Sequence, residues 1–172
     1  MENASYLNEL FGMTGQVATI IGGAGALGRS LALGLGKNGA RVVIAGRNDE
    51  NGRQAVEYLA SEGVDAIFQQ VDTTSKESLR RLRDKALTLT GQVERLGNCA
   101  GANVGTSFLD VDADKWDEIM AINLKGTMMA CQVYIETMLG QEHGGSILNI
   151  GSVNSARPLS RVFAYAASKA GV

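Results

Sequence analysis

Proline, histidine and cysteine are scarce in this chain, and each scarcity excludes a class of protein or site. One proline in 172 residues excludes a disordered, proline-rich chain. The two cysteines, Cys99 and Cys131, are too few for a disulfide framework, which suits a reducing compartment. The single histidine, His143, stands between Glu142 and Gly144, so we expect it in a solvent-exposed turn without a catalytic role, and we expect no metal site.

A strong charge of one sign and long apolar runs are missing as well. The net charge of −2 gives no general attraction to nucleic acid or to an anionic membrane. No apolar stretch reaches membrane-spanning length, and the N-terminus lacks a basic region followed by an apolar run. We therefore expect a cytoplasmic protein whose partners include neither nucleic acid nor membrane.

Glycine is abundant, with 22 residues, and the hydrophobic content of 45% suits a folded globular protein. Short β-branched apolar runs alternate with segments of helical spacing, which predicts an α/β domain with a doubly wound parallel sheet and helices on both faces. The length suits a single domain over residues 1–172. The expected strands are 17–21, 41–45, 64–71, 93–98 and 146–150, and the expected helices are 27–38, 49–60, 76–88, 113–139 and one that starts near 163, with Asp49 and Ser75 as N-caps.

A glycine-rich turn joins the first expected strand to the first expected helix. Glycines let the backbone turn tightly and approach a pyrophosphate, which would rest on the positive end of the helix. The alternative is a tight turn without a ligand. We expect a dinucleotide site that includes Gly22, Gly23, Gly25, Ala26, Leu27 and Gly28.

The end of the second expected strand decides which dinucleotide is favoured. Gly46 stands where an acidic side chain would hold the ribose 2′-hydroxyl, and Arg47 follows it. A guanidinium suits a 2′-phosphate, so we favour NADP over NAD. The alternative is that Arg47 is a solvated surface charge and the site is indifferent to the phosphate.

Two further strand ends carry candidate cofactor contacts. Asp72 and Thr73 end the third expected strand, where the Asp72 carboxylate could accept from the adenine amino group or cap the next helix. Asn98, Ala100 and Gly101 end the fourth, where small residues would let a ribose lie against the backbone, although an ordinary turn would have the same residues.

Tyr165 and Lys169 stand four residues apart on the last expected helix, which places both side chains on one face. A cation beside a phenol favours the phenolate, and a phenolate near neutral pH can act as an acid/base catalyst when hydride moves to or from a carbonyl carbon. The alternative is an exposed amphipathic pair of the kind that many helices carry.

These motifs together resemble the short-chain dehydrogenase/reductase family. The resemblance extends from about residue 11 to residue 172 and rests on the glycine turn, the segments 98–101, 123–126 and 165–169, and Ser152. It implies a Rossmann-like fold and a nicotinamide cofactor. It also implies a homo-oligomer, dimer or tetramer, for the full-length protein.

The resemblance assigns a role to each residue of a catalytic tetrad. Tyr165 would be the acid/base, and Lys169 would lower its pKa and hold the nicotinamide ribose. Ser152 would orient the substrate oxygen, and Asn123 would hold a water in a proton relay behind Lys169. The implied reaction is hydride transfer between the nicotinamide and a secondary alcohol or ketone, and Arg157 and Arg161 point to sugar acids as one substrate class.

Several residues depart from the family pattern. Ile21 replaces a threonine and Ala26 a glycine in the turn, and Arg95 and Gly97 fall in a strand that should be buried and aliphatic. A buried unpaired arginine would cost several kcal/mol. The family also continues beyond the tyrosine–lysine helix, so we expect a C-terminally truncated chain whose strand 146–150 is an uncovered edge. A non-catalytic fragment that binds dinucleotide or associates with intact subunits is therefore the alternative function.

Overall fold

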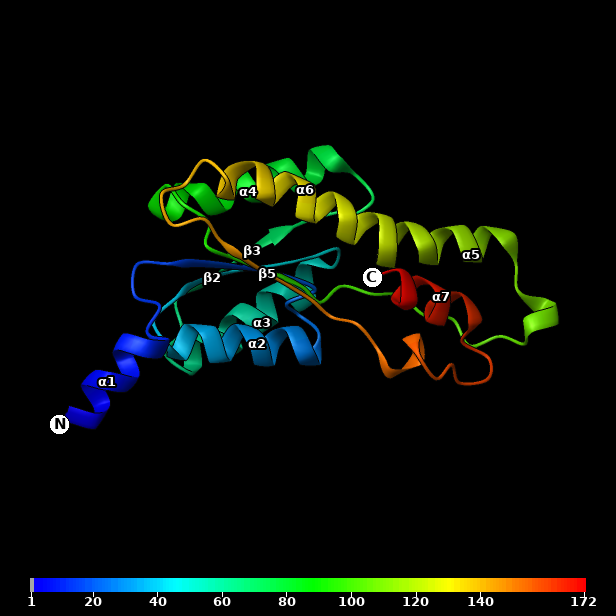
Figure 1. Ribbon diagram of the computed structural model, residues 1–172, viewed down its shortest axis with the longest axis horizontal. Coiled ribbons are helices and arrows are strands. Elements are labelled where there is room, and N and C mark those ends of the chain that lie inside the picture. Colours follow the sequence, from blue (N-terminus) through cyan, green and yellow to red (C-terminus); the bar gives the residue numbers. More distant parts are fainter. Residues whose placement is uncertain (1) are drawn as a thin grey trace.

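A computed structural model describes residues 2–172, and its centre is a five-stranded sheet of order β3-β2-β1-β4-β5 (Figure 1). Each neighbouring pair of strands is parallel. This confirms the predicted doubly wound, Rossmann-like sheet. The strands are β1 (Val17–Ile21), β2 (Arg41–Gly46), β3 (Ala66–Gln70), β4 (Arg95–Asn98) and β5 (Ser146–Asn149).

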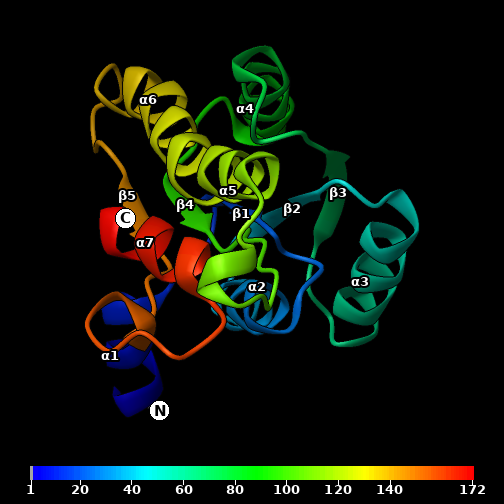
Figure 2. The ribbon, with the colours of Figure 1, turned by 90° about the vertical axis from the view of Figure 1, so that its right-hand side faces the viewer.

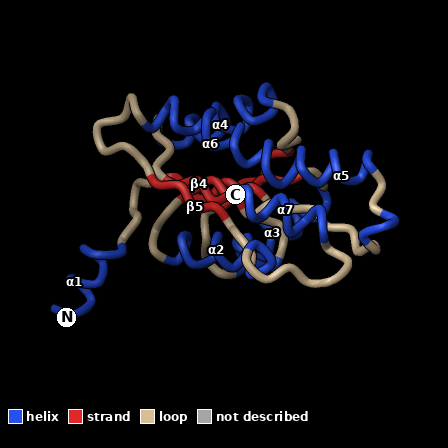
Figure 3. Tube along the Cα trace, turned by 45° about the vertical axis from the view of Figure 1, so that its right-hand side comes forward, coloured by secondary structure: helices blue, strands red, loops and turns tan. Residues whose placement is uncertain are grey.

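Helices cover both faces of the sheet, as predicted. Figure 3 shows α4 and α6 on one side of the strands and α2 and α3 on the other, while α1 projects from the body. The helices are α1 (Glu2–Phe11), α2 (Ala26–Lys37), α3 (Asp49–Ser61), α4 (Lys76–Thr90), α5 (Ala113–Met120), α6 (Gly126–Met138) and α7 (Phe163–Gly171), with short turns η1 (Phe108–Asp110), η2 (Ala121–Lys125) and η3 (Val153–Ser155).

The central strands are buried on both faces because each helix layer covers one of them. Val17 and Val43 pack toward α4 and α6 together with Leu82 and Tyr134. Ile20, in contrast, packs with the cluster that includes residues of α2 and α3. Such two-sided burial explains why β1 and β2 read as continuous apolar runs rather than alternating ones. The chain order reverses direction across the sheet at β1, and ligands of such folds bind outside the strand ends at this point.

Helix N-caps agree with the sequence in one case and correct it in another. The Ser75 hydroxyl accepts from Ser78 N, which confirms Ser75 as the cap of α4. At α3 the cap is Asn48, whose side chain accepts from Asn51 N, and Asp49 is the first helical residue. The prediction that Asp49 is the cap was therefore wrong. Asp49 lies in the first turn of α3, where a negative charge interacts favourably with the helix dipole without capping the helix.

The predicted helix over 113–139 is interrupted. Residues Ala121–Lys125 form a π-turn (η2) between α5 and α6, so the polypeptide inserts an extra residue in the middle of an otherwise continuous helix. Such π-turns occur often at functional sites, and this one contains Asn123. Helix α1 was not predicted, and its apolar side chains Leu7, Leu10 and Phe11 are exposed.

Two residues of β4 that looked wrong for a buried strand have physical explanations. Arg95 is half-buried rather than buried, and its Nη1 donates to the Glu94 carbonyl at 3.0 Å, so the guanidinium is paired. A side chain at Gly97 would put a Cβ 2.9 Å from Ile20 Cδ1 and 3.0 Å from Leu31 Cδ2. Glycine leaves these two side-chain ends in place, whereas a larger residue would have to displace them, and Leu31 belongs to α2, which packs onto the strand.

β5 is an edge strand that pairs with β4 alone within the described chain. Its side chains are mostly exposed, and Leu148 is 48% exposed. The uncovered edge predicted for residues 146–150 is present. Among residues 2–172, none of the helices has the length and apolar content that a membrane crossing needs.

Candidate active site

A cavity of about 380 Å³ opens at the carboxyl ends of β1, β2 and β4, at the point where the chain order reverses. We call it the first cavity. Of the expected cofactor contacts it is lined by Gly22, Gly25, Arg47, Thr73, Ala100 and Gly101. Gly46, at the expected ribose position, lines it as well, together with residues that were not predicted as contacts: Ile21, Ala24, Ala45, Asn48, Asn51, Val71, Cys99 and Ile122.

The glycine turn is shaped so that two of its positions admit no side chain. Gly22 has φ of +82°, and a Cβ there would lie 2.6 Å from Ala100 N. A Cβ at Gly28 would collide with the Gly22 carbonyl. The turn and α2 are therefore packed tightly against the end of β4, which leaves the first cavity open for a ligand. Ala26 begins α2 and does not have a positive φ, so alanine is tolerated there.

The N-terminus of α2 has polar groups free to bind an anion. Its cap residue, Gly25, lines the first cavity and has no side chain that could accept from the backbone N–H groups of the first turn. The first turn of α2 has no acidic residue either. In contrast, α3, α4 and α5 are capped by Asn48, Ser75 and Asp112. Uncapped backbone N–H groups at a helix start attract phosphate. The turn thus fits the pyrophosphate of a dinucleotide.

The end of β2 offers a positive charge without an acid. Arg47 lines the first cavity, and open space surrounds the place where a Gly46 side chain would be. Asn51 also lines this cavity, and its backbone N–H donates to the Asn48 side chain. The residues at this strand end are Gly46, Arg47 and Asn48, so none of the three offers the carboxylate that would hold a 2′-hydroxyl.

The third strand end differs in part from expectation. Thr73 is buried and lines the first cavity, whereas Asp72 does not line it. Asp72 Oδ1 accepts from Thr74 Oγ1 at 2.7 Å and from Thr74 N at 2.9 Å. These hydrogen bonds, with a smaller contribution from the positive charge of Arg47, lower the pKa of the Asp72 carboxyl. Asp72 therefore shapes the turn, while Ser75 caps α4.

Asn98 is placed differently from the other residues of its motif. Its Nδ2 donates to Asn149 Oδ1 at 2.8 Å, which ties the ends of β4 and β5 together. Asn98 does not line the first cavity, whereas Ala100 and Gly101 do. The sequence could not show that Asn98 bonds within the sheet while Ala100 and Gly101 line the cavity, because the partner of Asn98 lies on a strand far along the chain.

Asn123 joins three segments of the site. Its Oδ1 accepts from Ala102 N at 2.7 Å, and its Nδ2 donates to Ala102 O at 2.9 Å and to Ser168 Oγ at 3.0 Å. Ser168 Oγ in turn donates to the Tyr165 carbonyl at 2.7 Å. Both side chains are fully buried. The π-turn, the loop after β4 and α7 are thereby held in one arrangement.

Lys169 and Tyr165 lie one turn apart on α7. The Lys169 ammonium donates to the Ile150 carbonyl at 2.7 Å, and a Cβ built on Gly101 would lie 3.9 Å from it, so it borders the loop that lines the first cavity. Burial lowers the pKa of Lys169, and the interaction with Cys99 opposes this shift. Tyr165 is half-buried.

Ser152 begins the turn η3 and is half-buried, and its hydroxyl accepts from Asn154 N at 3.2 Å. The turn η3 packs against α7, the helix that carries Tyr165 and Lys169. Figure 2 shows this turn and α7 together beside the end of β5. The structure thus gathers Asn123, Ser152, Tyr165 and Lys169 from three separate parts of the chain into one region.

Aromatic side chains flank this region. Phe163, at the start of α7, packs edge-on against Phe108 with ring centroids 4.9 Å apart, and its centroid lies 5.5 Å from that of Trp116. Trp116 is therefore a half-buried neighbour of the site. The Arg161 carbonyl accepts from Thr106 N at 2.8 Å, which fastens the segment before α7 to the loop after β4.

His143 lies in an exposed turn, as predicted, and Arg157 and Arg161 are exposed as well. Among residues 2–172, no group of three or more His, Cys, Asp or Glu side chains lies together in a way that could hold a metal ion.

Comparison with known proteins supplies the family. A sequence profile described as short chain dehydrogenase matches residues 16–172. An uncharacterized oxidoreductase of Staphylococcus aureus (strain N315) is 31% identical over 160 residues, which are 93% of this chain and 68% of that protein.

Solved structures agree. The crystal structure of a short chain dehydrogenase from Mycobacterium smegmatis has a TM-score of 0.88 and 29% identity, over 93% of this chain and 68% of that one. That of a variant actinorhodin polyketide ketoreductase with NADPH has a TM-score of 0.87 and 28% identity, over 91% of this chain and 60% of that one. This chain thus spans about two thirds of the length of such relatives. With the glycine turn, the parallel sheet and the Tyr165–Lys169 helix in place, the chain belongs to the short-chain dehydrogenase/reductase family.

Proposed function

We propose that this chain forms the cofactor-binding and catalytic part of an NAD(P)-dependent oxidoreductase that prefers NADP and interconverts a secondary alcohol and a ketone. The observation that carries the proposal is the buried Lys169 ammonium, fixed by Ile150 O one helical turn from Tyr165 and bordering the loop that lines the first cavity. The bound nicotinamide would supply the hydride chemistry, and the chain supplies position and electrostatics.

Each residue of the proposed tetrad has a physical task. Tyr165 exchanges a proton with the substrate oxygen as the acid/base. The Lys169 ammonium, one helical turn away, favours the charged form of the phenol. Ser152 donates to the oxygen where negative charge develops. Asn123 fixes α7 through Ser168 and so holds Tyr165 in place, beside the proposed relay water.

The cofactor preference follows from the charge at the end of β2. Arg47 presents a guanidinium to the first cavity where NAD-binding relatives of this fold carry an acid. The ketoreductase whose structure contains NADPH is a similar protein with that cofactor. Sugar acids remain the proposed substrate class, because the exposed Arg157 and Arg161 lie on the segment between Ser152 and Tyr165.

Location and assembly are further parts of the proposal. The low cysteine count supports a cytoplasmic location. Exposed apolar side chains on α6 and just after it, Met128, Ile135 and Leu139, support a homo-oligomer, because contiguous apolar surface commonly marks subunit contacts.

The test compares the wild-type chain with Tyr165→Phe in alcohol-dependent reduction of NADP, followed at 340 nm over a panel of secondary alcohols and sugar acids. We expect turnover by the wild type and a loss of about a hundredfold or more in the variant, with NADPH binding unchanged. Undiminished turnover in the variant would contradict the assigned role. Dinucleotide binding by a folded wild type without turnover of any alcohol would instead favour the non-catalytic alternative.

A further inference from the structure

A second cavity, of about 450 Å³, lies next to the first and shares Arg47 and Val71 with it. Arg47 thus stands between the two. The other residues that line the second cavity are Gln69, Gln70, Asp72, Ser75, Ser78 and Arg81. Apart from Val71, every side chain that lines it is polar or charged, so the cavity suits a hydrophilic ligand.

The charges of the second cavity favour an anion. Arg47 and Arg81 contribute two guanidinium groups against one carboxylate, that of Asp72. Asp72 Oδ1 is already occupied by its two hydrogen bonds from Thr74. The guanidinium fork matches the geometry of phosphate oxygens.

Two hydroxyl groups add donors. Ser75 Oγ accepts from Ser78 N at 3.2 Å, and Ser78 Oγ accepts from Asp72 N at 3.0 Å. Each oxygen therefore uses a lone pair within the protein, and its O–H remains able to donate to a ligand. Ser78 is 7% exposed, so its position is fixed by packing.

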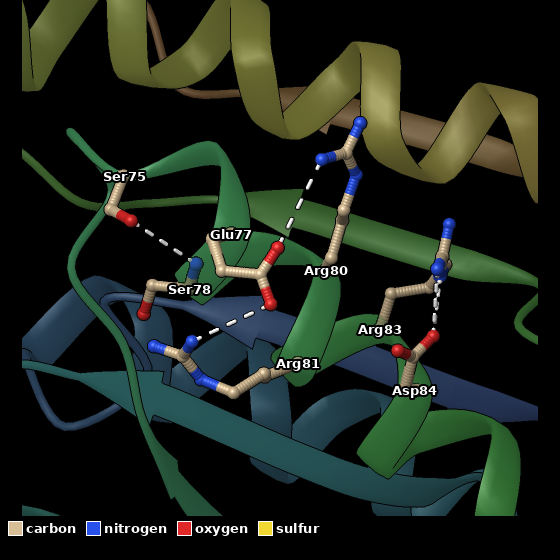
Figure 4. Close-up of polar contacts among 7 residues, drawn as sticks. All are labelled: Ser75, Glu77, Ser78, Arg80, Arg81, Arg83 and Asp84. Atoms are coloured by element: carbon tan, nitrogen blue, oxygen red, sulfur yellow. Dashed lines mark hydrogen bonds and ion pairs between the residues drawn. The ribbon is translucent and has the colours of Figure 1, made fainter.

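Arg81 is held loosely. It shares the Glu77 carboxylate with Arg80, at 3.6 Å for Arg81 and 3.9 Å for Arg80, and all three side chains are exposed. Figure 4 shows the two arginines reaching Glu77 from opposite sides. Exposed pairs of this kind contribute little to stability. Arg81 can therefore exchange Glu77 for a ligand that carries more negative charge.

We propose that Arg81 is a second determinant of cofactor choice, which binds the phosphate monoester on the adenosine ribose of NADP together with Arg47. The inference rests on the proposed function, in which a nicotinamide dinucleotide occupies the first cavity. With the pyrophosphate at the start of α2 and the adenosine toward the ends of β2 and β3, the adenosine ribose comes to Arg47, the residue shared by both cavities.

The experiment uses a matched pair of substitutions on one helix. Dissociation constants for NADPH and NADH are measured by fluorescence titration of the wild type, Arg81→Gln and Arg80→Gln at fixed ionic strength. The two variants lose the same charge and the same partner, Glu77, but only Arg81 lines the second cavity. We expect Arg81→Gln to raise the Kd for NADPH about tenfold and to leave NADH within about twofold. Arg80→Gln should leave both within about twofold.

Equal losses of NADPH affinity in the two variants would overturn the proposal, because they would report only the overall electrostatic field of the charges on α4. So would a loss for NADH as large as that for NADPH in Arg81→Gln. Arg47→Asp serves as the positive control, since it removes the guanidinium that lines both cavities.

Smaller probes separate this inference from the catalytic proposal and separate two sources of phosphate. Arg81→Gln should weaken binding of 2′-AMP but not of 5′-AMP, a result that holds whether or not any alcohol is turned over. Inorganic phosphate should compete more strongly with NADPH than with NADH, and Arg81→Gln should reduce this difference. Phosphate that binds through Arg81 without displacing NADPH would identify a separate anion site and would refute the assignment to the cofactor.

Discussion

At the scale of a single residue, the buried charge of Lys169 carries an energetic cost. Its ammonium is buried and donates to the Ile150 carbonyl, yet burial lowers its pKa. A lowered pKa in the folded chain means that the unfolded chain binds the proton more tightly, so the charge weakens the fold at neutral pH. Under the proposed function, the same cation would activate Tyr165, which gives the chain a reason to keep this costly charge.

We predict that Lys169→Met has a higher free energy of unfolding than the wild type at pH 7, by about 1 kcal/mol, measured by urea denaturation. The sign follows from the direction of the shift. As pH rises through the folded pKa toward the unfolded value, the wild type regains stability, so the difference between the two proteins should shrink. A difference that stayed constant or widened up to pH 10 would refute this account.

Some single residues could be interpreted from the sequence, and others could not. The glycine turn, Arg47 and the spacing of Tyr165 and Lys169 could be identified because each lies within one local segment. The close packing at Gly97 could not, because it involves Leu31, which lies on a helix that packs across the strand. The hydrogen bond between Asn98 and Asn149 could not be predicted for the same reason, because the two residues meet only through the pairing of β4 with β5.

Helices and strands were predicted well as elements and less well at their ends. Short continuous apolar runs between helical segments predicted the five strands along the chain, since both faces of a parallel sheet are buried. The π-turn around Asn123 could not be predicted, because its extra residue is stabilised by contacts of the Asn123 side chain with Ala102 and Ser168. The choice of Asn48 over Asp49 as the cap of α3 was likewise decided by local geometry.

The cap of α3 gives a prediction at this scale. Asn48→Ala should lower the free energy of unfolding by about 1 kcal/mol, because Asn51 N loses its acceptor. Asp49→Ala should cost less, since it removes only an exposed pair with Arg53 and a favourable charge near the helix start. Chemical denaturation of both variants, with Asn48→Ser as the conservative control, checks the order. A larger loss for Asp49→Ala would show that Asp49 is the cap after all.

The whole molecule leaves one side of its sheet open. β5 has a hydrogen-bonded neighbour on one side only in the described chain, and Leu148 on it is exposed. Unpaired strand edges of this kind template association with other chains. The arrangement of the first cavity, in contrast, depends on β1, β2 and β4, which lie inside the sheet.

We predict that Leu148→Lys reduces concentration-dependent self-association, measured by sedimentation velocity, because a charge on the edge opposes strand addition. Leu109→Lys is the control, since Leu109 is even more exposed but lies on η1, away from the strand edge. Equal effects of the two substitutions would mean that overall charge, rather than the β5 edge, governs association.

The empty space around Gly46 has an evolutionary consequence. No atom stands within 4 Å of the place where its side chain would begin, and its backbone conformation is ordinary. A Cβ can therefore be added there without a clash, as in an aspartate that would hold a ribose hydroxyl. Under the proposed function, a single Gly46→Asp substitution would therefore bring a carboxylate to the adenosine ribose in one evolutionary step, while Arg47 and Arg81 would still favour the phosphorylated cofactor.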